Sequence, residues 1–178
     1  MKKYELTNET LEWNGCTLHR IRALRDFGDV RTGDLGGWVE SEHNLSHEGN
    51  CWLYDDAKAY DGAWLAGEAK AYDSAELIDH AHAFGNARLS GDVHVYGTVC
   101  FSGDMYATRD VMYIDNWGWP VTISDNHINI WHHAHTIDEW ATFSDEEIAE
   151  MHVDALGWWK EFGDTLLDIA KKHQKGEI

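Results

Sequence analysis

A six-residue repeat without gaps fills the middle of the chain and limits its fold more than any other feature. Ten hexads follow one another over residues 51–110, and residues 45–50 read as an eleventh. The first and third positions of the ten are apolar throughout, whereas the fifth and sixth are almost entirely Gly, Asp, Asn, Ser, Thr or Glu. Alternating apolar positions predict a short strand with one buried face, and the small polar residues that follow tolerate the backbone of a corner.

The size of the third-position residues indicates how many hexads complete one coil. A short strand and a corner in every six residues predict a parallel β-helix. With three hexads per coil, Leu53, Ala71 and Leu89 stack in one column, and large side chains over small ones fill a narrow core without voids. Four hexads per coil would instead stack Leu53 on Leu77. We therefore predict a mainly β fold with about three triangular coils, left-handed winding being favoured.

The segments that flank the repeat are predicted to cap it. A β-helix exposes strand edges and core at both ends, so caps are required. Asn14-Gly15 is a hairpin signal before the repeat, and Ser144 with Glu147 forms a capping box that begins a helical segment after it. The predicted divisions are an N-terminal β cap, the β-helix, terminal strands with irregular segments, and acidic amphipathic helices (residues 1–44, 45–110, 111–143 and 144–178).

The net charge of −18 excludes direct binding to the nucleic-acid backbone. The excess of acidic residues grows along the chain, from −2 in residues 1–44 to −7 in residues 45–110 and −9 in residues 111–178. No apolar stretch approaches the roughly 20 residues that span a bilayer, and no signal-peptide pattern opens the chain. We therefore expect a cytoplasmic protein with no membrane partner and with reduced thiols at its three cysteines.

Two cap strings and the hexads carry a resemblance to a known group of proteins. DLGGWVESE (residues 34–42), NLSHEGN (residues 44–50) and the A-x-[LV]-Y-G-[ND] hexads resemble phage and prophage-encoded hexapeptide-like repeat proteins. That family has no well-defined activity to carry over. The resemblance implies a β-helix, a viral origin and a role in phage–host interaction, which would place the protein in the host-cell cytoplasm.

These features favour a binding protein without enzymatic activity. A rigid acidic rod can imitate the charge of nucleic acid, so we expect inhibition of a host macromolecule, with a defence component as the favoured target in an anti-CRISPR-like or other anti-defence role. The expected partner is a host protein, and a homodimer or homotrimer is compatible with the pattern. The acidic residues expected at the interface are Glu146, Glu147, Glu150, Asp154, Glu161, Asp164 and Asp168. The aromatic residues expected there are Trp52, Trp64 and Trp158.

Two alternatives remain open. Arg20, Arg22 and Arg25 would form an anion-binding cluster in an oligomer that captures a phosphorylated small molecule. A hexapeptide-repeat metalloenzyme or acyltransferase would instead need a histidine site at a trimer interface, and His82 and His94 point outward from different faces. Because the hexads run without an inserted loop that could bring a base to a substrate, we expect neither catalysis, nor a cofactor, nor a bound metal.

Overall fold

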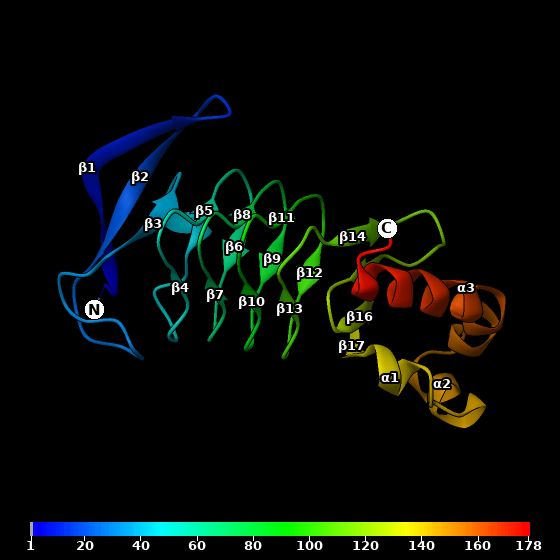
Figure 1. The fold of residues 1–178 in the computed structure, drawn as a ribbon. Coiled ribbons are helices and arrows are strands. Elements are labelled where there is room, and N and C mark those ends of the chain that lie inside the picture. The colour runs from blue at the N-terminus through cyan, green and yellow to red at the C-terminus, as the bar shows by residue number, and fades with distance from the viewer. Residues whose placement is uncertain (1) are drawn as a thin grey trace.

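The computed structural model describes residues 2–178 and shows a parallel β-solenoid with a cap at each end (Figure 1). Parallel pairing joins Trp52 to Lys70, then to Arg88, then to Tyr106, so one coil contains 18 residues. The two-residue strands of the hexads are β4 (Trp52–Leu53), β5 (Lys58–Ala59), β6 (Trp64–Leu65), β7 (Lys70–Ala71), β8 (Glu76–Leu77), β9 (His82–Ala83), β10 (Arg88–Leu89), β11 (His94–Val95), β12 (Cys100–Phe101) and β13 (Tyr106–Ala107). The predicted triangular coil is therefore confirmed; its left-handed winding stays a prediction.

The solenoid makes about four turns, because residues before the ten hexads supply a first coil. Strand β3 (Leu35–Val39) pairs in parallel with β5, and Leu45 forms a parallel bridge with Leu65. The three faces are face 1 (β3, β5, β8 and β11), face 2 (Leu45, β6, β9 and β12) and face 3 (β4, β7, β10 and β13). The hexads alone predict about three coils, so the structure adds one turn.

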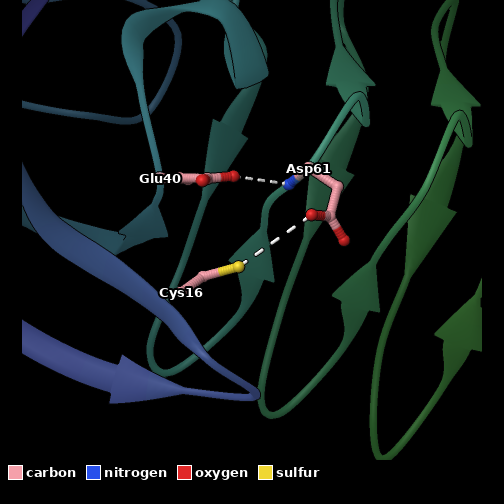
Figure 2. Close-up of side chains that lie close together, drawn as sticks. All are labelled: Cys16, Glu40 and Asp61. Atoms are coloured by element: carbon pink, nitrogen blue, oxygen red, sulfur yellow. Dashed lines mark hydrogen bonds between the residues drawn. The ribbon is translucent and has the colours of Figure 1, made fainter.

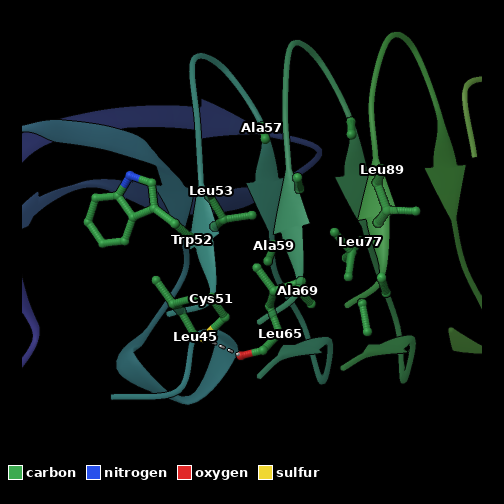
Figure 3. Close-up of a cluster of buried hydrophobic side chains, with 14 of the residues drawn as sticks. Leu45, Cys51, Trp52, Leu53, Ala57, Ala59, Leu65, Ala69, Leu77 and Leu89 are labelled. Atoms are coloured by element: carbon green, nitrogen blue, oxygen red, sulfur yellow. Dashed lines mark hydrogen bonds between the residues drawn. The ribbon is translucent and has the colours of Figure 1, made fainter. Parts of the chain in front are cut away.

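The first and third positions of the hexads point into the solenoid and are buried (Figure 3). Leu53 pairs with Ala71, and Ala71 pairs with Leu89, as the alternation of large and small residues predicts. Corners follow each strand, where Asp55, Asp61, Asp73 and Asp79 have φ between 50° and 59°. The coils are also tightly stacked at the corners. A Cβ atom on Gly49 would lie 2.3 Å from the backbone oxygen of Gly67, which is too close for any residue other than glycine.

An antiparallel hairpin extends from the first coil and covers part of face 1. It consists of β1 (Tyr4–Trp13) and β2 (Cys16–Ala23), and β2 pairs with β3. A 3-10 helix (Glu42–Asn44) then leads into face 2. The hairpin corrects one prediction: Trp52 is only 1% exposed, because Tyr4 and Phe27 pack their rings against it, and it is not an outward partner-binding side chain.

The last coil is followed by a second packed unit of strands and helices. Its antiparallel strands are β14 (Met112–Ile114), β15 (Val121–Ile123), β16 (His127–Ile130) and β17 (His133–Thr136). Its helices are α1 (Ile137–Trp140), α2 (Asp145–Met151) and α3 (Ala155–Lys175). Ser144 and Glu147 form the predicted capping box at α2. None of the helices described combines the length and the hydropathy that a membrane span requires.

Candidate functional site

The acidic residues predicted to contact a partner all lie exposed on or between the last two helices. Glu146, Glu147 and Glu150 belong to α2, Asp154 precedes α3, and the others lie on α3: Glu161, Asp164 and Asp168. Two of them have local structural roles. The Glu147 carboxylate accepts the backbone N–H of Ser144, and Asp168 accepts a hydrogen bond from Lys172 at 2.6 Å. Their binding of a partner stays a prediction.

The two remaining tryptophans of the predicted interface occupy different environments. Trp64 lies on face 2 and is 38% exposed. Trp158 is half-buried, because it stacks on Trp119 and its indole N–H donates to the backbone oxygen of Trp117. Trp158 therefore contributes to packing between α3 and the β14–β15 loop.

The predicted arginine cluster is occupied by internal partners. Arg20 lies 3.2 Å from the Asp56 carboxylate, and Arg22 pairs with Glu5. Arg25 lies over the ring of Phe27, with its guanidinium carbon 5.7 Å from the ring centre. An anion would have to displace the carboxylates of Asp56 and Glu5 to reach Arg20 and Arg22. The phosphorylated-ligand alternative stays a prediction.

A histidine–aspartate pair lies on the part of face 1 that the hairpin leaves uncovered. His94 is at the second position of its hexad on β11, and its Nδ1 lies 3.2 Å from Oδ1 of Asp110. The same oxygen accepts the backbone N–H of His94 at 3.0 Å. Asp110 therefore holds the imidazole ring and favours the tautomer with hydrogen on Nδ1. The other ring nitrogen, Nε2, is then an acceptor, as a general base requires.

A groove of about 450 Å³ lies beside this pair, where the last coil meets the C-terminal unit. Its lining consists of Tyr96, Arg109, Asp110, Val111, Met112, His173 and Ile178. Asp110 thus borders the groove and holds His94. Arg109 fastens the two units together: Nη1 donates to the backbone oxygen of His173 at 3.0 Å, and Nε lies 3.2 Å from Asp125.

His173 contributes an imidazole to the lining of the groove, to which His94 is connected through Asp110. It is 4% exposed, and its Nε2 has no hydrogen-bond partner among residues 2–178. Burial lowers the pKa of His173 below its ordinary value, which favours the neutral ring. The groove therefore combines a fixed guanidinium, an aspartate and a buried neutral histidine.

One group of side chains among the described residues has the spacing of metal ligands (Figure 2). Cys16, Glu40 and Asp61 each offer a donor atom, and the three atoms lie within 4.8 Å of one another. Desolvation, followed by the charges of Glu40 and Asp61, raises the pKa of the Cys16 thiol. Glu40 already accepts the backbone N–H of Asp61 at 2.8 Å. These contacts account for the cluster as a link between the hairpin and a solenoid corner.

The comparisons with known proteins give one informative result. No protein-family model matches the chain. Over 72 residues the chain is 40% identical to the uncharacterized acetyltransferase YdcK of Escherichia coli (strain K12). The match covers 35% of this chain and 22% of that protein, so the chain spans less than a quarter of its relative's length.

This similarity corrects the predicted function. The relative is named as an acetyltransferase, and the prediction of a non-enzymatic inhibitor of a host defence component is wrong. The resemblance holds for the hexapeptide-repeat solenoid, whereas the phage origin has no support. The prediction that the chain is not an enzyme assumed that only an inserted loop could bring a base to a substrate. The structure shows that adjacent coils bring a histidine and an aspartate, His94 and Asp110, together without an inserted loop.

Sequence reasoning considered His94 but missed its partner. His94 and Asp110 are 16 residues apart, and one coil contains 18 residues, so Asp110 lies on the next coil two residues before the position stacked on His94. A search for acid–histidine pairs separated by nearly one coil length would have found it. The contribution of His173 depends on how α3 packs against the solenoid, which the repeat does not encode.

Proposed function

We propose that this chain is an acyltransferase of the hexapeptide-repeat type, in which His94 is the general base. The observation that carries the proposal is the contact between His94 Nδ1 and Asp110 Oδ1 at 3.2 Å beside an open groove. The solenoid architecture and the similarity to a protein named as an acetyltransferase support it. Of the two enzyme classes in the second alternative, the proposal takes the acyltransferase and leaves out the metalloenzyme.

The arrangement suits proton removal from an acceptor that binds in the groove. Nε2 of His94 would take the proton from an acceptor hydroxyl or amine as its oxygen or nitrogen attacks the carbonyl carbon of an acyl thioester. The new ester or amide bond forms, the carbon–sulfur bond breaks, and the thiolate leaves with the proton returned by the imidazolium. Asp110 would stabilise the imidazolium between these steps.

Face 2 suggests how a second copy would associate with the first. Its outward positions are all uncharged in a chain of net charge −18: Trp64, Ala66, His82, Phe84, Cys100 and Ser102. Trp64 and Phe84 are each 38% exposed. Self-association through face 2 would bury these rings without bringing like charges together. His82 would then lie in the interface, which makes it the rival candidate for the base.

The test measures thiol release from acetyl-coenzyme A with a panel of hydroxyl and amine acceptors. We expect His94→Asn to lower kcat by about 10²–10⁴-fold, since the base is lost while a polar side chain is kept at this position. Asp110→Asn should lower kcat by a smaller factor, because the asparagine retains a hydrogen-bonding group beside Nδ1. His82→Asn is the matched control and should leave kcat unchanged.

Two results would contradict the proposal. Loss of activity in His82→Asn with full activity in His94→Asn would move the base to face 2. Absence of thiol release with every acceptor would reject acyl transfer from acetyl-coenzyme A. Light scattering on the three variants shows whether any loss of activity comes from a changed assembly.

A further inference from the structure

Lys3 and Cys51 form a buried pair that the proposed acyl transfer does not use. Lys3 has no exposed surface, although lysine is among the residues least often fully buried. Its Nζ lies 3.1 Å from Sγ of Cys51 and donates to the backbone oxygen of Cys51 at 2.8 Å. Both atoms that accept a hydrogen bond from Nζ thus belong to one cysteine, which lies 48 residues further along the chain.

The pair lies among apolar side chains and backbone carbonyl groups, since the backbone oxygens of Ser46, Glu48 and Leu65 lie 3.5, 3.7 and 3.6 Å from Sγ of Cys51. Cys51 also has no exposed surface and lies at the first position of the first hexad, within the end of the solenoid core (Figure 3). The ring centre of Phe27 is 5.1 Å from Nζ. Burial lowers the pKa of Lys3, and burial raises the pKa of the Cys51 thiol while Lys3 opposes that rise. The neutral, nucleophilic form of the Lys3 amine is therefore more favoured beside the sulfur than it would be in water.

We propose that Lys3 and Cys51 are a redox-sensitive cross-linking site, at which hydrogen peroxide leads to a covalent bond between Nζ and Sγ. Peroxide first oxidises the thiol to a sulfenic acid, and one water leaves. The Lys3 amine then attacks the sulfur, the S–O bond breaks, and a second water leaves with the hydroxyl and one amine hydrogen. The two side chains lose two hydrogen atoms in total, and the sulfur is the atom that is oxidised by the peroxide.

The geometry favours this route over the other fates of a sulfenic acid. Reacting atoms in near-attack positions are about 3–3.5 Å apart, and the nitrogen–sulfur distance falls in this range. Sulfenic acids condense with nearby nitrogen atoms as well as with thiols. The three cysteines are all free, so no disulfide competes in the structure.

The other two cysteines serve as internal comparisons. Cys16 faces carboxylates, with Asp61 Oδ1 3.9 Å from its sulfur. Cys100 lies beside Asn129, whose side-chain amide donates to the Cys100 backbone oxygen at 2.8 Å. Neither sulfur has a lysine amine among its hydrogen-bond partners within residues 2–178. Oxidation at these positions should stop at the cysteine itself.

The cross-link would fasten the hairpin to the solenoid. Lys3 immediately precedes β1, and Cys51 immediately precedes β4 of the first coil. A covalent bond between them closes a long loop, which restricts the unfolded chain and keeps the start of β1 on the core. Peroxide would therefore make the N-terminal cap harder to detach, and a thiol reductant would reverse the effect.

The experiment treats the full chain with millimolar hydrogen peroxide and maps its peptides by mass spectrometry. We expect a peptide that joins the Lys3 and Cys51 segments with a loss of about 2 Da, which dithiothreitol converts back to two separate peptides. Lys3→Arg keeps the positive charge but removes the amine, so it should accumulate oxidised Cys51 without a cross-link. Cys51→Ser should give no joined peptide.

The decisive measurement uses the unmodified sequence, so it does not depend on whether a variant folds. If Cys51 of that protein stays reduced, or is oxidised to the sulfinic acid with no joined peptide, the proposal is wrong. A joined peptide that contains Cys16 or Cys100 in place of Cys51 would also overturn it. As a second readout, the Tm should rise after peroxide, fall back after dithiothreitol, and stay unchanged in Cys51→Ser.

Discussion

Asp79 holds a corner of the solenoid by two separate interactions. Its φ of 59° lies in the left-handed region, which aspartate tolerates better than most residues. Its Oδ2 also accepts the backbone N–H of Gly97 on the next coil at 3.0 Å. Asp73 repeats this arrangement with Gly91 at 2.9 Å. Some of the acidic residues therefore stabilise the corners of the solenoid, and their presence does not require a positively charged partner.

Replacing Asp79 tests these two interactions together. Asp79→Ala loses the hydrogen bond to Gly97 and places an alanine at positive φ, so we expect unfolding to become easier by about 2–3 kcal/mol. Asp79→Asn keeps an acceptor oxygen and the tolerance for positive φ, and should differ little from the original. Urea denaturation monitored by circular dichroism measures both. If Asp79→Ala is as stable as the original protein, neither interaction matters at this corner.

At the scale of elements, the hairpin is attached to the solenoid through a buried ion pair. Lys58 Nζ on β5 lies 3.3 Å from Glu76 on β8, and both side chains are less than 10% exposed. The β1 residue Trp13 covers them: its ring centre is 4.2 Å from Nζ, and its indole N–H donates to the Glu76 carboxylate at 3.1 Å. Tyr60 donates to the same carboxylate at 3.0 Å.

Glu76 should therefore be costly to remove alone. Glu76→Leu leaves the Lys58 charge buried without its partner, and we expect a loss of about 3–5 kcal/mol in the free energy of unfolding. The double variant Lys58→Met with Glu76→Leu should recover most of that loss, because no uncompensated charge remains. A double-mutant cycle by chemical denaturation gives the coupling. If the double variant is no more stable than Glu76→Leu, the loss comes from the contacts of Trp13 and Tyr60.

The elements also show which parts of the structure the sequence could predict. The strands, corners and core columns follow from a pattern that repeats every six residues, so Leu53, Ala71 and Leu89 were placed correctly. Trp52 follows the same pattern as an outward residue and is nevertheless buried, since its cover comes from β1 and the loop at Phe27. The position of a residue in the repeat predicts whether its side chain points inward or outward. It does not predict whether another segment of the chain covers the outward face.

At the scale of the whole molecule, the C-terminal unit contains several buried histidines that are sensitive to acid. Three histidines of the C-terminal unit have pKa values lowered chiefly by burial: His127, His133 and His173. His127 is also influenced by the charges of Glu139 and Asp104, and His173 by those of Asp125 and Arg109. Nδ1 of His127 and Nε2 of His173 are buried without hydrogen-bond partners in the described chain. These rings are therefore held neutral in the folded protein.

Acid should therefore destabilise the C-terminal unit. On unfolding, the three histidines regain their ordinary pKa of about 6.5, so below that pH the unfolded chain binds more protons than the folded one. The free energy of unfolding must then fall as the pH decreases through about 6.5, and we expect a lower Tm at about pH 5.5 than at about pH 7.5. His173→Gln should reduce this pH dependence, whereas His43→Gln, at an exposed position in the 3-10 helix, should leave it unchanged. An equal Tm at both pH values would show that protons reach these rings without unfolding.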